Sequence, residues 1–225
     1  MPIPSPQPRF VYLLQNRCFL LLMALLGLLL SVPFLSEFTY GRVILTLVNV
    51  TVMLTAVAAV GRTRFSLLIA VLLVAPAVVF RFLALAFSEV GYLALSAGFN
   101  AAFYAFVLGD LLYYVLRRDV MTDDKLYGAV AAYMLVAIFW ASLYGVVQYF
   151  YPDAYAVNGT VKRLDVPELI YFSFTALTTA GFGDITPVLI QSRFLTILEM
   201  VTGVMYVAIL IARLTGVYPI QDTKK

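Results

Sequence analysis

The sequence contains no histidine, and Cys18 is its single cysteine. The absence of histidine removes the usual general base, proton shuttle and transition-metal ligand. One cysteine permits neither a disulfide within the chain nor a cysteine-based metal cluster. Cys18 begins an apolar run, so we expect it to be a small core or lipid-facing side chain. Together these absences argue against an enzyme.

Charged residues are also scarce. Asp, Glu, Lys and Arg make up 12% of the 225 residues, whereas hydrophobic residues make up 63%. A chain this apolar is not an ordinary soluble domain. The formal net charge of +3 is spread over the predicted loops, so we expect no nucleic-acid partner. The composition predicts an all-α membrane protein with lipids as partners.

Six apolar runs are long enough for membrane-spanning helices, which need ~20 residues each. A further run, residues 166–178, is apolar but too short to span, and it lies between the last two long runs. It has the position of a re-entrant half-helix. The predicted spans are residues 18–35, 43–60, 65–87, 92–116, 127–150 and 194–217.

The regions outside the spans predict the orientation of the chain. Residues 1–17 are rich in proline, and we expect a disordered N-terminus. No small-residue cleavage site soon follows the first span, so we expect that span to be retained. If the N-terminus is cytoplasmic, most Lys and Arg residues fall on the cytoplasmic side. We therefore expect both termini inside, with a linker at 119–126 and a short tail at 218–225.

The short run begins like a capped helix and ends in a glycine-rich strip. Asp165 stands at the N-cap, Pro167 in the first turn and Glu168 at the third helical position. Alternating glycines allow successive carbonyl oxygens to point at one axis. Rings of such carbonyls can replace the hydration shell of an ion. The strip consists of Thr178, Thr179, Ala180, Gly181, Phe182, Gly183 and Asp184.

Residues 127–217 resemble the pore domain of the potassium channel superfamily, in which each subunit supplies an outer helix, a pore helix, a filter and an inner helix. The resemblance implies that K⁺ is coordinated by backbone carbonyls of Thr179, Ala180, Gly181 and Phe182, with the Thr179 hydroxyl closing the innermost site. It implies that Asp184 lies behind the filter and bonds to the pore helix. It further implies a homotetramer in a bacterial inner membrane, with no cofactor beyond the permeant K⁺.

Two positions of the strip differ from the family's commonest sequence. Ala180 stands where valine is usual, and Phe182 stands where tyrosine is usual. Both changes could loosen the filter, so a poorly selective monovalent cation channel remains an alternative to a K⁺-selective one. The strip could also be a loop that merely joins two helices, and the chain a non-conducting scaffold or a secondary transporter. The transporter is disfavoured because no inverted repeat appears.

The last predicted span carries two residues of interest. Gly203 lies twenty residues beyond Gly183, where family members often place a hinge glycine. A glycine can permit bending, or it can let a neighbouring helix pack closely, and the sequence does not separate the two. Glu199 lies one helical turn earlier. We expect it to face the protein behind the filter, with a pore-lining position as the alternative.

Residues 18–118 resemble the four-helix unit of voltage-gated channels, but the fourth span lacks its charges. Residues 92–116 contain no Lys or Arg, and their one charge is Asp110. Voltage gating requires several cationic side chains that move through the membrane field. We therefore expect weak or no voltage dependence. Arg81 is a second intramembrane charge, at a different predicted depth, and could pair with Asp110 or with Glu89.

Overall fold

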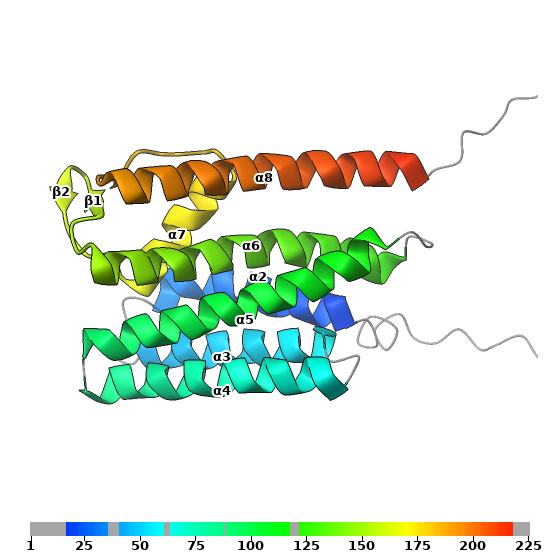
Figure 1. The fold of residues 1–225 in the computed structure, drawn as a ribbon, viewed down its shortest axis with the longest axis horizontal. Helices are drawn as coiled ribbons and strands as arrows, with labels where there is room; N and C mark the ends of the chain where they lie inside the picture. Colours follow the sequence, from blue (N-terminus) through cyan, green and yellow to red (C-terminus); the bar gives the residue numbers. More distant parts are fainter. Residues whose placement is uncertain (1–16, 36–40, 61–63, 88, 118–121, 218–225) are drawn as a thin grey trace, which may run out of the picture.

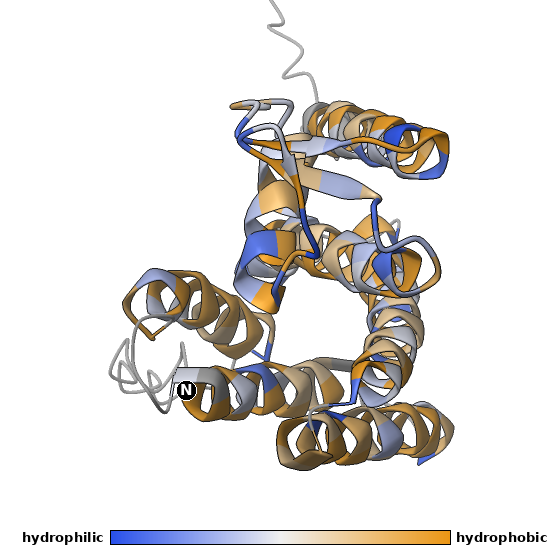
Figure 2. Ribbon diagram, turned by 90° about the vertical axis from the view of Figure 1, so that its left-hand side faces the viewer, coloured by the Kyte–Doolittle hydropathy of each residue, from blue (hydrophilic) through white to orange (hydrophobic). Residues whose placement is uncertain are grey.

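The computed structural model describes residues 17–35, 41–60, 64–87, 89–117 and 122–217. Long helices run side by side along one axis, and Figure 2 views them nearly end-on. Residues 1–16, residue 118 with the first part of the predicted linker (119–121), and the tail at 218–225 lie outside the described residues. The structure therefore does not test the predictions made for those segments.

Each predicted span corresponds to a helix whose ends lie within a few residues of the predicted ones. The largest differences are at the starts of α6 and α8, each of which begins four residues before its predicted span. Helix α6 begins at Asp123 because Thr122 caps it by accepting a hydrogen bond from the Lys125 amide. The long helices are α2 (Arg17–Leu35), α3 (Gly41–Val60), α4 (Arg64–Phe87), α5 (Val90–Leu116), α6 (Asp123–Phe150) and α8 (Ile190–Val217).

Helix α7 (Val166–Leu177) is short, lies between α6 and α8, and contacts both of them (Figure 1). A small antiparallel sheet lies at the end of the molecule where α6 ends and α8 begins (Figure 1). Its strands are β1 (Tyr155–Val157), β2 (Thr160–Val161) and β3 (Ile185–Pro187), in the order β2-β1-β3. The sheet joins the segment before α7 to the segment after the strip.

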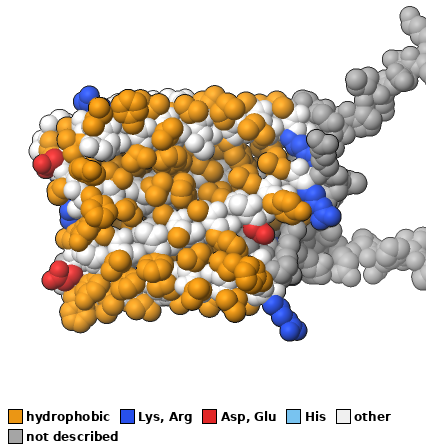
Figure 3. Space-filling view, viewed as in Figure 1, with side chains coloured by type: hydrophobic (Ala, Val, Ile, Leu, Met, Phe, Trp, Pro, Cys, Tyr) orange, Lys and Arg blue, Asp and Glu red, His pale blue; other side chains and the backbone are white. Residues whose placement is uncertain are grey.

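Apolar side chains cover the middle of the molecule, and the charged side chains gather mostly toward its two ends (Figure 3). Within the described residues, five helices are long and apolar enough to cross a membrane: α2, α4, α5, α6 and α8. In α3 the apolar stretch covers residues 43–59 and is shorter. This distribution suits a hydrocarbon environment.

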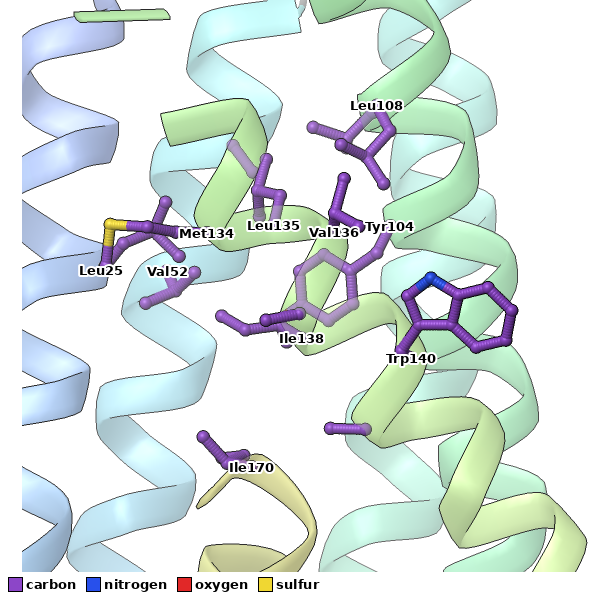
Figure 4. Close-up of a cluster of buried hydrophobic side chains, with 14 of the residues drawn as sticks. Leu25, Val52, Tyr104, Leu108, Met134, Leu135, Val136, Ile138, Trp140 and Ile170 are labelled. Atoms are coloured by element: carbon purple, nitrogen blue, oxygen red, sulfur yellow. The ribbon is translucent and has the colours of Figure 1, made fainter. Parts of the chain in front are cut away.

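The core joins the first four helices to α6 and α7 (Figure 4). Tyr104 of α5, Val52 of α3 and Leu25 of α2 are fully buried in a cluster with Leu135 of α6. Glycines allow the close approach: a Cβ at Gly128 of α6 would lie 3.2 Å from the Cys18 sulfur. Small residues at helix contacts are typical of membrane bundles. The four-helix unit thus packs on α6 of its own chain.

At the end of the molecule opposite the sheet, the Asp124 carboxylate also links the four-helix unit to α6. Asp124, in the first turn of α6, accepts hydrogen bonds from the Cys18 amide of α2 and the Tyr114 hydroxyl of α5, each 3.0 Å long. One side chain therefore links three helices. Near it, Arg213 of α8 donates a 2.7 Å bond to the Arg117 carbonyl at the end of α5.

Candidate functional site

The start of α7 has the predicted cap. The Asp165 carboxylate accepts a 2.9 Å hydrogen bond from the Glu168 amide, and the Glu168 carboxylate accepts a 3.0 Å bond from the Asp165 amide. Lys162 also forms a 2.6 Å ion pair with Glu168. The reciprocal bonds satisfy two amides that a helix start would leave unpaired. This sequence prediction is confirmed.

A buried amide that the sequence analysis missed also holds this helix start. The Gln148 side chain of α6 donates a 3.0 Å bond to the Leu164 carbonyl and accepts a 3.0 Å bond from the Leu164 amide. A buried glutamine with both groups paired fixes the backbone that it bonds. In the sequence, the indication of this role was a single amide side chain at the end of an apolar run.

The polar residues between Tyr151 and Lys162 predict an exposed segment between α6 and α7, and most of this segment is exposed, but its middle is not. Ala154, Tyr155 and Ala156 are buried, and Tyr155 stacks edge-on against Phe172 of α7. These three residues are buried because β1 pairs with β3 and packs against α7. The Asn158 amide donates a 2.7 Å bond to the Asp184 carbonyl, so this segment braces the outer end of the strip.

The strip has a backbone that alternates in handedness. Thr179, Gly181 and Gly183 have positive φ angles of 58°, 49° and 82°, whereas Ala180 and Phe182 between them do not. Such alternation turns successive N–H groups to one side of the chain. Thr179 is β-branched, so its positive φ stores backbone strain of a kind that clusters at functional sites.

The N–H side of the strip faces α7. The Thr179 amide donates a 2.9 Å bond to the Ala176 carbonyl, and the Gly181 amide donates a 3.2 Å bond to the Thr175 carbonyl. The Thr178 hydroxyl also bonds back to the helix, at 2.7 Å from the Phe174 carbonyl. Since the C=O of a trans peptide lies opposite its N–H, the Thr178 and Ala180 carbonyls point away from α7. The strip is exposed along residues 178–183 of this single chain.

Two aromatic rings and a carboxylate meet at the outer end of the strip. Phe182 stacks on Tyr171 of α7, with ring centroids 6.4 Å apart and planes 11° from parallel. The Tyr171 hydroxyl hydrogen-bonds to the Asp184 carboxylate, and this bond raises the pKa of the Tyr171 phenol. The hydroxyl therefore connects the strip to α7 through Asp184 rather than through residue 182.

Gly203 lies where α8 crosses the end of α7. A Cβ at this position would collide with the Leu177 carbonyl oxygen and lie 3.0 Å from the Leu177 carbonyl carbon. The Tyr133 hydroxyl of α6 donates a 3.4 Å bond to the same carbonyl oxygen. The glycine thus has a packing role, and helix α8 continues through it without interruption. Bending of α8 at Gly203 stays a prediction.

Glu199 lies on α8 and has none of its surface exposed. It accepts a hydrogen bond from the Tyr144 hydroxyl of α6, and its other carboxyl oxygen lies beside the Ser173 hydroxyl of α7. The carboxyl group therefore stands between three helices behind the strip. The sequence pointed to Glu199 as an intramembrane charge but gave no indication of its partners.

The charges of the four-helix unit lie apart from the strip. Arg81, near the end of α4, donates a 3.4 Å hydrogen bond to the Thr46 hydroxyl of α3. Asp110 lies near the end of α5, and α4 and α5 are joined by a short turn. Two such helices run in opposite directions, so these positions fall at opposite ends of the pair. The structure does not bring Arg81 and Asp110 together.

Comparison with protein families agrees with this geometry. Residues 129–218 match the family model described as an ion channel. The match makes this part of the chain similar to ion-channel domains, and it supports the resemblance to the potassium channel superfamily. No curated protein and no solved structure gives a match. The channel domain and the apolar helices together define a multi-pass membrane protein.

Proposed function

We propose that the chain is one subunit of a homotetrameric, K⁺-selective channel that gives passive flux. The observation that carries the proposal is the orientation of the strip: α7 holds the Thr179 and Gly181 amides, so the carbonyls of Thr178 and Ala180 point away from α7. Carbonyls of Thr179, Ala180, Gly181 and Phe182, together with the Thr179 hydroxyl, would replace the water around K⁺. No cofactor is required, because the permeant ion is the ligand.

Four copies are needed because one chain supplies only one strip. A closed ring of identical subunits surrounds an axis symmetrically. Two exposed surfaces support this assembly: Phe182 is 73% exposed next to the strip, and α8 has an uncovered apolar face. That face consists of Ile197, Leu198, Val201, Val204 and Met205. In the tetramer, neighbouring subunits and the pore would cover part of it.

The proposed topology has six spans, including α3, with α7 entering the membrane from the outer side. The positive-inside bias favours cytoplasmic termini, and a bacterial inner membrane is the expected location. The C-terminal end of α7 carries partial negative charge, which would favour a cation held between four such ends. Asp184 and the small sheet would then lie at the outer mouth of the pore.

A poorly selective monovalent cation channel is the second candidate. It is favoured by Ala180, whose small side chain fills less space behind the strip than valine, and by Phe182, which has no hydroxyl. The Tyr171–Asp184 bond favours the selective channel, since it tethers the strip from the neighbouring position. The two candidates differ in the ratio of K⁺ to Na⁺ permeability.

Ion flux into liposomes tests the proposal. Purified protein should carry K⁺ much faster than Na⁺, and Gly181→Ala should abolish the difference, because a Cβ at φ 49° strains the strip. Gly159→Ala is the matched control, since Gly159 also has a positive φ of 79° but lies in the turn between β1 and β2. Equal effects of both variants, or no flux from the unaltered protein, would contradict the proposal.

A further inference from the structure

The buried carboxyl group of Glu199 has a role that ion coordination does not explain. It joins the three helices that surround the strip, through Tyr144 of α6 and Ser173 of α7. Among the described residues it has no Lys or Arg partner. The titratable groups that face it are Tyr133 and Tyr144 of α6 and Tyr155 of β1. Tyrosines are neutral at neutral pH, so none of them balances a negative charge.

The hydrogen bonds around Ser173 show which group supplies a proton. The Ser173 hydroxyl oxygen lies 2.6 Å from the Ala137 carbonyl oxygen and also within hydrogen-bond distance of the Glu199 carboxyl oxygen. A hydroxyl carries one proton, and a carbonyl only accepts. With an ionised Glu199, Ser173 would face two acceptors and could satisfy one of them.

A proton on Glu199 satisfies every group in this network. Glu199 then donates to the Ser173 oxygen, and Ser173 donates to the Ala137 carbonyl. Tyr144 donates to the second carboxyl oxygen of Glu199. The bonds form one directional chain from α6 through α8 to α7 and back to α6, and such chains strengthen their members.

Ser173 stands close to the strip along α7. Thr175 and Ala176, two and three residues later, accept the amides of Gly181 and Thr179. A shift of α7 at Ser173 would therefore move the carbonyls to which the strip is tied. Interiors transmit such shifts because they are closely packed.

We propose that Glu199 is a protonated carboxylic acid that positions α7, and that its ionisation at alkaline pH releases α7 and impairs the filter. This inference rests on the proposed channel function. An ionised Glu199 would be a buried charge without a cation, an arrangement that proteins avoid. Glu199 is thus a positioning residue that acts through Ser173, not a ligand of the ion.

The test compares wild type with Glu199→Gln and Glu199→Leu. A glutamine reproduces the shape and the donor and acceptor of the protonated acid, but it does not ionise. Glu199→Gln should keep the wild-type permeability ratio of K⁺ to Na⁺ at neutral pH. Glu199→Leu should lower that ratio by roughly an order of magnitude, because the buried hydroxyls lose their partner.

The pH profile separates positioning by a neutral acid from a merely structural contact. From neutral pH to just below ~10, where free tyrosine ionises, the wild-type ratio should fall while the glutamine ratio stays constant. Identical pH profiles, or loss of selectivity in Glu199→Gln at neutral pH, would overturn the inference.

Infrared spectroscopy provides a readout that does not depend on conduction. Wild-type protein at neutral pH should show the carbonyl stretch of a buried protonated carboxylic acid, and Glu199→Gln should lack that band. Absence of the band in wild type would overturn the inference even if the glutamine variant did not fold. An unselective wild-type channel that shows the band would contradict the proposed function and leave the protonated acid in place.

Discussion

At the scale of single residues, the sequence predicts the backbone conformation of the strip at its two glycines. Gly181 and Gly183 have the positive φ angles that their residue type permits, and Asp165 and Glu168 form the expected cap. Thr179 was not predictable in the same way, because a β-branched residue rarely adopts a positive φ. Its amide bonds to the Ala176 carbonyl at the end of α7, a turn that residue types alone do not indicate.

The Tyr171 hydroxyl gives a prediction at this scale. Tyr171→Phe removes the bond to Asp184 while keeping the ring that stacks on Phe182. We expect the K⁺ to Na⁺ permeability ratio to fall severalfold, as measured from reversal potentials. Tyr113→Phe, at an exposed tyrosine of α5, is the control and should have no effect. An unchanged ratio in Tyr171→Phe would show that the bond does not stabilise the filter.

The same bond predicts the sign of a pH effect. Because the bond raises the pKa of the Tyr171 phenol above 10.0, its contribution is fully present below pH 10 and is lost as the pH rises through the higher value. The difference between wild type and Tyr171→Phe should therefore be constant at neutral pH and vanish in strong alkali. Measuring it in the Glu199→Gln background removes the effect proposed for Glu199.

At the scale of elements, apolar length predicted the helices well, and polar composition predicted the segment before α7 in part. A run of ~20 apolar residues is a local signal, so the spans agree with the structure to within a few residues. The pairing of β1 with β3 joins residues about thirty positions apart, on either side of α7. Polar composition therefore predicted the exposed residues of the segment, whereas the burial of Ala154, Tyr155 and Ala156 depends on this pairing.

Gly203 allows the packing and hinge interpretations to be separated. Gly203→Ala should lower the thermal stability of the purified protein, because the new methyl group collides with Leu177, and overpacking costs about 1–3 kcal/mol. Gly109→Ala in α5, where a Cβ meets open space, should not lower it. A pure hinge would give the opposite pattern: unchanged melting in Gly203→Ala and altered opening in single-channel records.

Gln148 gives a second prediction at this scale. Gln148→Leu leaves the Leu164 amide and carbonyl unpaired in a buried place, at a cost of about 1–3 kcal/mol for each unsatisfied group. We expect a lower melting temperature and weakened selectivity, since α7 begins at this point. Gln191→Leu, on an exposed position of α8, is the control. Equal melting of the two variants would refute the anchoring role.

At the scale of the whole molecule, the sequence left open how the first four helices pack. The structure places them directly on α6 of the same chain, through the core of Figure 4 and the Asp124 bonds. Such contacts depend on which faces of several helices meet, and one-dimensional hydropathy does not specify them. The absence of Lys and Arg from α5, by contrast, is read from the sequence directly.

The charge pattern of α5 predicts weak or no voltage dependence. Moving one charge across the membrane changes the energy by about 2.3 kcal/mol per 100 mV, and α5 offers no cationic side chain to move. Open probability in planar bilayers should therefore vary little across physiological voltages of either sign. A steep, sigmoidal dependence on voltage would require mobile charges elsewhere and would contradict this account.

The central claim is that the strip selects K⁺, and the bi-ionic reversal potential tests it most directly. Purified wild-type protein is placed in a planar bilayer with K⁺ on one side and Na⁺ on the other, at neutral pH. We expect a current that reverses far from zero, with the K⁺ side negative, because K⁺ permeates much more readily than Na⁺. A substantial current that reverses near zero would contradict K⁺ selection and favour the poorly selective channel.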